Sequence, residues 1–299
     1  MSPQTPQTPQ TLPTPNKDLM NAKMLTIQDV SCYGQCSLTV ALPVLSAMGI
    51  ETAIIPSAIL STHTGGFTGY TFRDLTEDLP AISAHWAKEG IAFDAVYTGY
   101  IGSKKQLDYI KNIVRTNAKK DALFIVDPVM ADNGKLYYGF DEEFAFEMAR
   151  FLKGADVILP NLTEAAFLLK EPYVAEGYDE KYIESLLRRL SALSGGDVVL
   201  TGVSFDNNKL GVAAYSKAND SVHYYFEERV EGAFHGTGDV YASCFSGALL
   251  RGLSLQDAAD LAVDFTVRAI KETLPARKEH WYGVKFESAL PYLIKRLDN

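Results

Sequence analysis

The chain carries a short glycine turn that ends in a carboxylate, formed by Gly236, Thr237, Gly238 and Asp239. The two glycines let the backbone turn tightly and approach a ligand closely. An apolar segment that predicts a helix follows directly, and a helix start offers unpaired N–H donors at the positive end of its dipole. A phosphate can bind there, and Asp239 would then be placed to accept a proton from an attacking hydroxyl group. The alternative is an ordinary glycine turn capped by an aspartate, because so short a pattern has many false positives.

Two further polar motifs follow predicted strands. Asp127 comes after one such strand, and Asn161 and Glu164 come after another, three residues apart at a predicted helix start. Oxygen ligands of this kind suit Mg²⁺, which usually keeps several waters and bridges carboxylates to substrate phosphates. Asn161 and Glu164 are therefore candidate oxygen ligands of Mg²⁺, and Asp127 could orient a metal-bound water or the nucleotide phosphates. The alternatives are a turn-forming Asp-Pro pair and a helix N-cap with a favourable acid in its first turn.

Composition limits the class of protein. The chain has 299 residues with 47% hydrophobic content, which suits one large α/β domain, although two small domains remain an alternative. A formal net charge of −9 argues against an extended nucleic-acid surface. The cysteines Cys32, Cys36 and Cys244 form no even disulfide set and are too few for a four-thiolate zinc site. A reducing cytoplasm fits this cysteine content. The spacing of Cys32 and Cys36 is not that of a C-x-x-C redox motif, so we interpret these two as small buried thiols.

The N-terminal segment differs in composition from the rest of the chain. Residues 1–23 repeat Pro, Gln and Thr and predict a disordered extension, because they cannot bury apolar surface. The segment lacks the apolar core of a secretory signal, and no later apolar run reads as a membrane span. Residues 24–299 contain no linker rich in Gly, Ser or Pro. We therefore expect one domain after the tail, in a soluble, cytoplasmic protein that binds neither nucleic acid nor membrane.

Short apolar runs alternate with longer amphipathic segments, which is the pattern of βαβ units. The spacing predicts strands at 24–28, 52–55, 95–98, 122–126, 157–159 and 198–201. It predicts helices at 37–48, 71–88, 106–116, 141–152, 180–193, 240–251 and 255–273. Two further runs with a turn signal between them predict an antiparallel hairpin at 210–215 and 221–226. We expect an α/β fold with a mainly parallel central sheet, helices on both faces, and ligands beyond the carboxyl ends of the strands.

These motifs together resemble the ribokinase superfamily, and within it the bacterial pyridoxal/pyridoxine/pyridoxamine kinases. The likeness spans residues 24 to about 273 and rests on the order and spacing of Ile27-Gln28 with Tyr33-Gly34, Ser61–Thr64, Thr98–Ser103, Asp127–Met130, Pro160–Glu164 and Gly236–Asp239. It implies a ribokinase-like fold without a large lid domain. It also implies ATP-dependent phosphorylation of the 5′-hydroxymethyl group of a vitamin B6 vitamer, Mg²⁺ as cofactor and a homodimer. The need for a monovalent cation is left open.

The resemblance also implies roles for single residues. Asp239 matches the catalytic base, and Gly236, Thr237 and Gly238 match the anion hole, where removing one strong donor typically costs about 3 kcal/mol. On the nucleotide side, the matching residues are Asp127, Asn161, Glu164 and Thr201, with Asp127 and Glu164 acting on the metal and the phosphates. For Thr201, a plain Thr-Gly strand end is the alternative.

On the vitamer side, the resemblance implies contacts from Asp29, His63, Thr64 and Tyr100. His63 stands among threonines and glycines, a polar setting that favours ligand contact over a core histidine. Several such kinases have a small hydroxyl residue where this chain has Asp29. We hypothesise that its carboxylate bonds the pyridine ring or favours a cationic substituent such as the pyridoxamine ammonium. The alternative is that Asp29 only caps its loop.

Three other functions share parts of this sequence pattern. The hydroxymethylpyrimidine (phosphate) kinases of thiamine synthesis share the fold and a hydroxymethyl acceptor, but their glycine-rich opening after the first strand is absent here. A sugar kinase is disfavoured because the N-terminal region has no acidic pair and the chain has no obvious inserted lid of strands. A non-catalytic nucleotide- or vitamer-binding protein is the alternative from a different class. Asp239 argues against it, since binding phosphate requires a glycine turn but no base.

Overall fold

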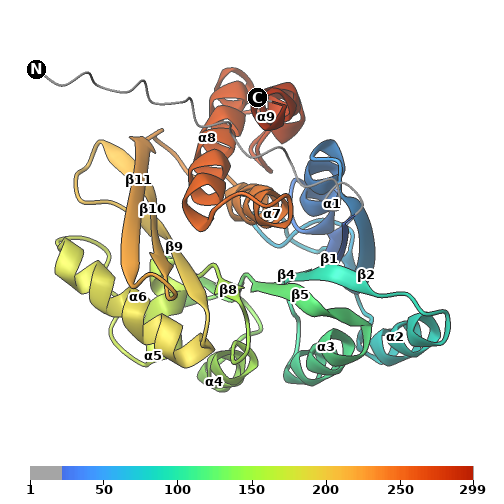
Figure 1. The fold of residues 1–299 in the computed structure, drawn as a ribbon. Coiled ribbons are helices and arrows are strands. Elements are labelled where there is room, and N and C mark those ends of the chain that lie inside the picture. The colour runs from blue at the N-terminus through green and yellow to red at the C-terminus, as the bar shows by residue number, and fades with distance from the viewer. Residues whose placement is uncertain (1–21, 299) are drawn as a thin grey trace, which may run out of the picture.

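The computed structural model describes residues 22–298, so most of the predicted tail and the last residue lie outside the described residues. The main strands are β1 (Lys23–Ser31), β2 (Glu51–Leu60), β3 (Phe72–Asp74), β4 (Phe93–Thr98), β5 (Ala118–Val126), β8 (Val157–Ile158), β9 (Asp197–Val203), β10 (Lys209–Ser216) and β11 (Ser221–Glu228). They form one nine-stranded sheet in the order β11-β10-β9-β8-β5-β4-β1-β2-β3 (Figure 1). The run from β9 to β2 is parallel, whereas β3, β10 and β11 pair antiparallel at the two edges.

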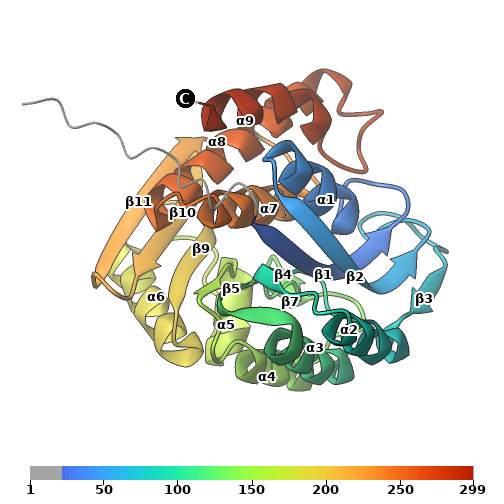
Figure 2. The same ribbon diagram turned by 45° about the vertical axis from the view of Figure 1, so that its right-hand side comes forward.

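Helices lie on both sides of the sheet, as the two views in Figures 1 and 2 show. On one side are α1 (Leu38–Ala47), α7 (Thr237–Leu250), α8 (Leu255–Thr273) and α9 (Leu290–Leu297). On the other side are α2 (Leu79–Lys88), α3 (Lys104–Asn117), α4 (Glu142–Phe151), α5 (Leu162–Leu169) and α6 (Glu180–Ser194). Within the described part of the chain, no helix combines the length and apolar character needed to cross a membrane.

Short elements complete the fold. Among residues 22–298, the 3₁₀ turns are η2 (Thr76–Asp78), η3 (Leu274–Ala276) and η4 (Phe286–Ala289). A separate two-stranded ribbon follows β5 and consists of β6 (Ala131–Asp132) and β7 (Lys135–Leu136). These pieces fill the connections around the sheet and leave its parallel centre uninterrupted.

The central strands are apolar because helices cover both of their faces. In β1 every side chain from Met24 to Asp29 is buried. Met24 packs into the core under α1, α7 and α8, whereas the next residue, Leu25, packs into the core on the α2–α6 side. This alternation fixes the register of β1, since a slip by one residue would exchange the two faces.

Helix α7 is held rigidly and so fixes the position of its own first turn. Its side chains from Val240 to Ala248 are all buried, including the polar ones. It packs closely on the end of α1, because a Cβ on Gly247 would lie only 2.5 Å from the sulfur of Met48. The first turn of α7 therefore has little freedom to move along the sheet.

The predicted α/β class, the mainly parallel sheet and the β10–β11 hairpin are confirmed. The prediction of one helix over 71–88 is wrong, because β3 and η2 precede α2 in this segment. Asp74 accepts a hydrogen bond from the backbone N–H of Thr76 at 2.7 Å, which forms a turn instead of a helix. Pro80 then stands in the first turn of α2, where a missing N–H costs nothing.

A buried amide joins α2 to α3 and gives a prediction about stability. The Asn117 side chain accepts a hydrogen bond from the Ser83 hydroxyl at 2.5 Å and donates one to the Ser83 carbonyl at 3.3 Å. We expect Asn117→Ala to lower the free energy of unfolding by about 1–3 kcal/mol, because the buried Ser83 groups lose their partner. Urea unfolding measures this. The control is Asn112→Ala on the exposed face of the same helix, and an equal loss in both variants would contradict the prediction.

Candidate active site

The glycine turn lies at the carboxyl edge of the sheet, where α7 begins. Gly236 is the residue before the first turn of α7 and has a positive φ of 79°. A Cβ on Gly236 would lie 1.7 Å from the carbonyl oxygen of Gln35, so only glycine fits. In contrast, a Cβ on Gly238 would meet no atom within 4 Å. The first N–H groups of α7 therefore border open space, as an anion site requires.

Asp239 lies in this first turn and is partly exposed. Burial of its carboxyl group, with the nearby negative charge of Asp29, raises its pKa to about 7. Hydrogen bonds from the Ser37 N–H and the Cys36 thiol act in the opposite direction. Asp239 is thus close to half-ionised at neutral pH, which suits a group that accepts and releases a proton.

Two other carboxyl groups lie close together beside the glycine turn. Asp127 directly follows β5, and its N–H donates to the carbonyl of Thr98 at 2.9 Å. Burial raises the pKa of Asp127 well above its ordinary value, and the charges of Glu164 and Asp239 add to this effect. Burial likewise raises the pKa of Glu164 to about 8. The structure therefore brings Asp127, Glu164 and Asp239 into one electrostatic cluster.

Glu164 also has a structural role that matches the capping alternative. Its carboxylate accepts the N–H of Asn161 at 2.9 Å and the N–H of Met130 at 3.1 Å. The side chain of Asn161 completes this capping box by accepting the N–H of Glu164 at 2.9 Å. Asn161 also donates to the carbonyl of Ala131 at 2.8 Å. Glu164 and Asn161 thus hold the loop after β5 against the start of α5.

Thr201 lies next to this capping box. Its N–H donates to the carbonyl of Pro160 at 2.9 Å, and Thr201 forms an isolated parallel bridge with Asn161. The candidate nucleotide residues from β5, β8 and β9 are therefore neighbours at one sheet edge. Whether they contact a nucleotide stays a prediction.

On the other side of Asp239, the predicted vitamer residues come from three strand ends. The Asp29 carboxylate accepts a hydrogen bond from the Ser31 hydroxyl at 2.8 Å. Burial raises the pKa of Tyr100 to about 12, with a further contribution from the negative charge of Asp29, so the two side chains are neighbours. Thr64 lies on an exposed loop. The bonds of Asp29 match the loop-capping alternative, and its contact with substrate stays a prediction.

His63 is buried, with an exposed fraction of 5%, and not in the open polar setting that its flanking residues indicated. Its Nε2 lies 2.6 Å from the carbonyl oxygen of Tyr282, and its Nδ1 accepts the N–H of Gly65 at 3.0 Å. Nε2 therefore carries the proton, and the ring is neutral with both nitrogens bonded. Gly34 packs so closely on this ring that a Cβ there would lie 2.2 Å from it. A vitamer contact from His63 stays a prediction and would involve the face of the ring.

Two features of the site were missed from the sequence. The segment Trp281–Gly283 comes from far along the chain and closes over the substrate side, with the Trp281 ring 4.6 Å from that of Phe67. The signal available in the sequence was the presence of aromatic residues beyond the span of the resemblance. The second feature is Cys36, for which the sequence predicted no chemical role.

The interpretation of Cys32 and Cys36 as buried thiols is wrong for Cys32, which is exposed, whereas Cys36 is partly buried. Cys32 directly follows the last residue of β1, at the carboxyl edge of the sheet.

Several of these carboxyl groups could contribute to a metal site. Among residues 22–298, no group of three or more His, Cys, Asp or Glu side chains could hold a metal by itself. Asp127 and Glu164 form a buried pair, however, and burial raises the pKa of each, with a further contribution from neighbouring negative charges. Such a pair fits Mg²⁺, which takes one or two carboxylates and completes its shell with water and substrate phosphates.

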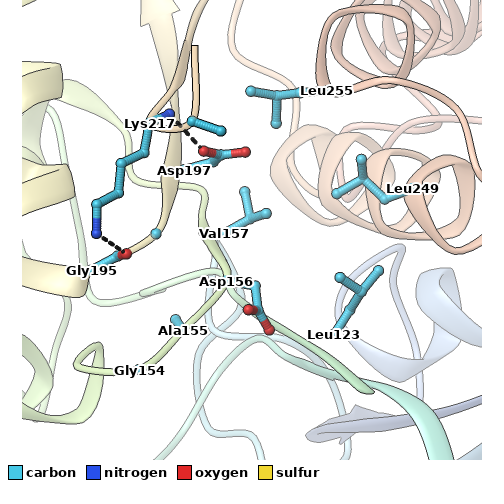
Figure 3. Close-up of a pocket in the computed structure, with 12 residues that line it drawn as sticks. Leu123, Gly154, Ala155, Asp156, Val157, Gly195, Asp197, Lys217, Leu249 and Leu255 are labelled. Carbon is cyan, nitrogen blue, oxygen red and sulfur yellow. Dashed lines mark hydrogen bonds between the residues drawn. The ribbon is translucent and has the colours of Figure 1, made fainter. Parts of the chain in front are cut away.

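A separate hollow of about 720 Å³ lies at the opposite, amino edge of the sheet (Figure 3). Its wall includes Asp156, Asp197 and Lys217, whose ammonium group donates to the carbonyl of Gly195 at 2.6 Å. None of the predicted site residues lines this hollow. The candidate active site is therefore the carboxyl edge around Asp239.

Comparisons with known proteins give relatives over most of the chain. A family model described as phosphomethylpyrimidine kinase matches residues 41–283. The pyridoxal kinase of Dictyostelium discoideum is 28% identical, and the match covers 88% of this chain and 92% of that protein. The pyridoxine/pyridoxal/pyridoxamine kinase of Bordetella avium is 26% identical, with coverages of 83% and 84%.

Solved structures of related proteins also match most of the chain. The pyridoxal kinase from Lactobacillus plantarum is 34% identical with a TM-score of 0.84, over 92% of this chain and 97% of that one. A Bacteroides thetaiotaomicron protein, provisionally assigned as a phosphomethylpyrimidine kinase and solved with pyridoxal, is 37% identical with a TM-score of 0.86, over 91% and 96%.

The carboxyl cluster predicts an unusual pH dependence of stability. The raised pKa values of Asp239, about 7, and Glu164, about 8, mean that the folded protein binds more protons than the unfolded chain between about pH 4.5 and 8. These groups therefore make the free energy of unfolding decrease as pH rises through this window. We expect about 10 mM Mg²⁺, a concentration chosen to exceed ordinary affinities, to stabilise the folded protein. The urea midpoint of unfolding should rise more at pH 8 than at pH 5.5.

Variants test the origin of this effect. Asp127→Asn should weaken both the pH dependence and the Mg²⁺ effect, because it removes one charge of the pair. Asp121→Asn, an exposed position on the same strand, should change neither. The explanation is wrong if both variants behave alike.

Proposed function

The chain belongs to the phosphomethylpyrimidine kinase family and is a kinase, and on this basis we propose that it phosphorylates the 5′-hydroxymethyl group of vitamin B6 vitamers with ATP. The resemblance to vitamin B6 kinases of the ribokinase superfamily is confirmed at the level of the family. The choice of vitamers is supported by relatives named as pyridoxal kinases and by the related structure solved with pyridoxal. The cytoplasm and a homodimer belong to the same proposal.

The observation that carries the proposal is the position of Asp239 in the first turn of α7. One residue before it, Gly238 borders open space at the positive end of the helix, where the transferring phosphoryl group would bind. The pKa of about 7 suits a base at neutral pH. A protein that only bound phosphate would need the glycine turn and not this carboxyl group.

In the proposed reaction, the vitamer hydroxyl oxygen attacks the γ-phosphorus of ATP. A new O–P bond forms while the bond from the γ-phosphorus to the bridging oxygen breaks, and ADP leaves with that electron pair. The hydroxyl proton goes to Asp239, and the N–H groups of Gly236, Thr237 and Gly238 bind the oxygens that gain negative charge. Mg²⁺, when bound, would neutralise the phosphate charge. Asp127 and Glu164 would hold the Mg²⁺ ion.

The remaining candidates divide into two groups around Asp239. On the nucleotide side, Asn161 and Thr201 orient the loop ends that would border the phosphates. On the vitamer side, the candidates are Asp29, His63, Thr64 and Tyr100. The neutral, buried ring of His63 would offer a flat surface to the pyridine, and Asp29 would act on its polar substituents.

Phosphorylation of a hydroxymethylpyrimidine is the second candidate function. The description of the family model and the provisional assignment of the Bacteroides thetaiotaomicron protein favour it. Its acceptor group is also a hydroxymethyl on a heteroaromatic ring, so the same base and anion hole would serve. The two functions differ only in the ring that the vitamer side accepts.

Product formation tests the proposal directly. Purified protein with ATP and Mg²⁺ is given pyridoxal, pyridoxine, pyridoxamine and hydroxymethylpyrimidine in separate reactions, and products are identified by mass spectrometry. We expect 5′-phosphorylated vitamers, with kcat lowered at least about 10³-fold in Asp239→Asn because the proton acceptor is lost. Phosphorylated pyrimidine alone would replace the proposal with the second candidate. Ligand binding without any ATP consumption would support a binding protein instead.

The pH profile gives a further prediction about the base. A base must be ionised to accept a proton, and the pKa of Asp239 is raised to about 7 by burial. We therefore expect kcat to fall about ten-fold for each pH unit below about pH 7. A kcat that stays constant from pH 7.5 to 5.5 would exclude Asp239 as a base with this pKa.

A further inference from the structure

The loop that leads into the glycine turn is held by the segment that follows α8. This loop, residues 229–235, connects β11 to α7. Residues 277–284, which we name the C-terminal strap, lie between η3 and η4 and pack on the loop. At the end of the strap, the N–H of Val284 donates to the carbonyl of His235 at 3.2 Å. His235 directly precedes Gly236, so the strap is bonded to the backbone at the entrance of the turn.

Arg277, the first residue of the strap, packs on the middle of the same loop. Its guanidinium carbon lies 5.1 Å from the centre of the Phe234 ring, which is a cation–π contact. Gly232 has a positive φ of 124°, and a Cβ there would lie 2.3 Å from Nη2 of Arg277. Nη1 lies 3.5 Å from the carbonyl oxygen of Glu231. One side chain therefore contacts the loop at three positions.

The loop residue beneath the guanidinium group is bonded to the glycine turn. The Thr237 hydroxyl donates to the carbonyl of Phe234 at 3.2 Å. Thr237 is the first residue of α7, whose following side chains from Val240 to Ala248 are all buried and fix the helix. The freedom that remains to the turn is therefore on the side of the loop. A shift of Phe234 would move the N–H groups of the turn, because the two are joined directly.

Arg277 differs in its partners from the arginine nearest to it along the chain. Arg268 on α8 forms an ion pair with Glu272 at 2.6 Å, which is an ordinary pair along a helix. Among residues 22–298, Arg277 forms no such pair with a carboxylate, and its contacts are with the loop. It is partly buried, whereas Lys278 beside it is exposed. The planar guanidinium group suits this position, since it stacks on a ring and donates at its edge.

We infer that Arg277 is a positioning residue of the phosphoryl transfer, which clamps the loop 229–235 and so holds the glycine turn in the geometry that receives the phosphoryl group. This inference rests on the proposed function, in which the turn is the anion hole. In this role Arg277 touches neither substrate and acts through Phe234 and Thr237. The C-terminal strap thereby becomes part of the machinery that the turn requires.

Turnover of Arg277→Met tests this role, with ATP and an acceptor that the wild type phosphorylates. Methionine keeps an unbranched stem and removes the guanidinium group. We expect kcat to fall about ten-fold or more, while KM for ATP and for the acceptor stays within about three-fold, because a displaced turn stabilises the transition state less. A wild-type kcat overturns the inference. A raised KM for ATP with unchanged kcat also overturns it, since Arg277 would then bind the nucleotide directly.

The matched control is Lys278→Met, which removes an exposed cation from the next position and should leave kcat unchanged. An equal fall of kcat in Lys278→Met and Arg277→Met would show a general effect of charge and would contradict the clamp.

Phe234→Leu measures the same contact from the other side, and serves also if Arg277→Met does not fold. Leucine removes the ring beneath the guanidinium group and keeps an apolar side chain. We expect a similar fall of kcat, with no further fall when both substitutions are combined, because each breaks the same contact. A wild-type kcat in Phe234→Leu, or losses that multiply in the double variant, would mean that Arg277 does not act through Phe234.

Hydrogen exchange gives a readout that does not depend on turnover. Exchange of the amides in residues 229–236 is followed by mass spectrometry in the wild type, Arg277→Met and Lys278→Met. We expect it to accelerate at least about three-fold in Arg277→Met alone, because the loop opens more often without its clamp. Residues 204–208, in the loop between β9 and β10, are the internal reference and should not change. Equal exchange of residues 229–236 in all three proteins refutes the clamp.

These experiments separate the inference from the proposed function. A wild type that phosphorylates none of the acceptors refutes the proposed function, and with it any role of Arg277 in phosphoryl transfer. An active wild type beside an Arg277→Met variant with unchanged kcat and unchanged exchange refutes the positioning role alone.

Discussion

Repulsion between buried carboxyl groups is the constraint around which the carboxyl edge of the sheet is built. Asp29, Asp127, Glu164 and Asp239 come from four separate elements, and burial raises the pKa of each. Like charges brought together away from water repel strongly, so such a cluster would open if nothing opposed the repulsion. Hydroxyl, amide and thiol donors from the neighbouring loops oppose it. The shapes of these loops follow from where those donors are needed.

Burial and this repulsion together give the site its chemical character. Burial, with a smaller contribution from the charge of Asp29, raises the pKa of Asp239 to about 7, which would suit the proposed base, and burial with the charges of Glu164 and Asp239 raises the pKa of Asp127. The first turn of α7 has the opposite, positive polarity. Its N–H groups therefore attract a phosphate to the edge of the acidic cluster. A nucleotide that arrives together with a divalent cation would satisfy both. In the proposed function, the acidic cluster and the positive helix end are complementary parts of one phosphoryl-transfer site.

Much of the fold was predictable because it depends on local patterns. Alternating apolar runs gave the parallel strands, and Gly236–Asp239 stood out because its residue types limit what the backbone can do. The prediction of one helix over 71–88 was wrong because strand pairing with the edge of β2 outweighed the helical pattern of this segment. The contact of His63 with Tyr282 joins residues 219 positions apart, and no periodicity carries that information. The donors on Asp29 and Glu164 likewise became visible only in three dimensions.

The long separation between His63 and Tyr282, 219 residues, has a consequence for biosynthesis. The chain emerges from the ribosome N-terminus first, so β1, β2 and their loops are exposed long before the residues that cover them exist. Neither α7, which carries Asp239, nor the Trp281–Gly283 segment is available until nearly all of the chain has been made. A ribosome-bound fragment can therefore form the early βαβ units without having a closed pocket. The last step of synthesis is also the step that completes the enzyme, so incomplete chains have no site in which to consume ATP.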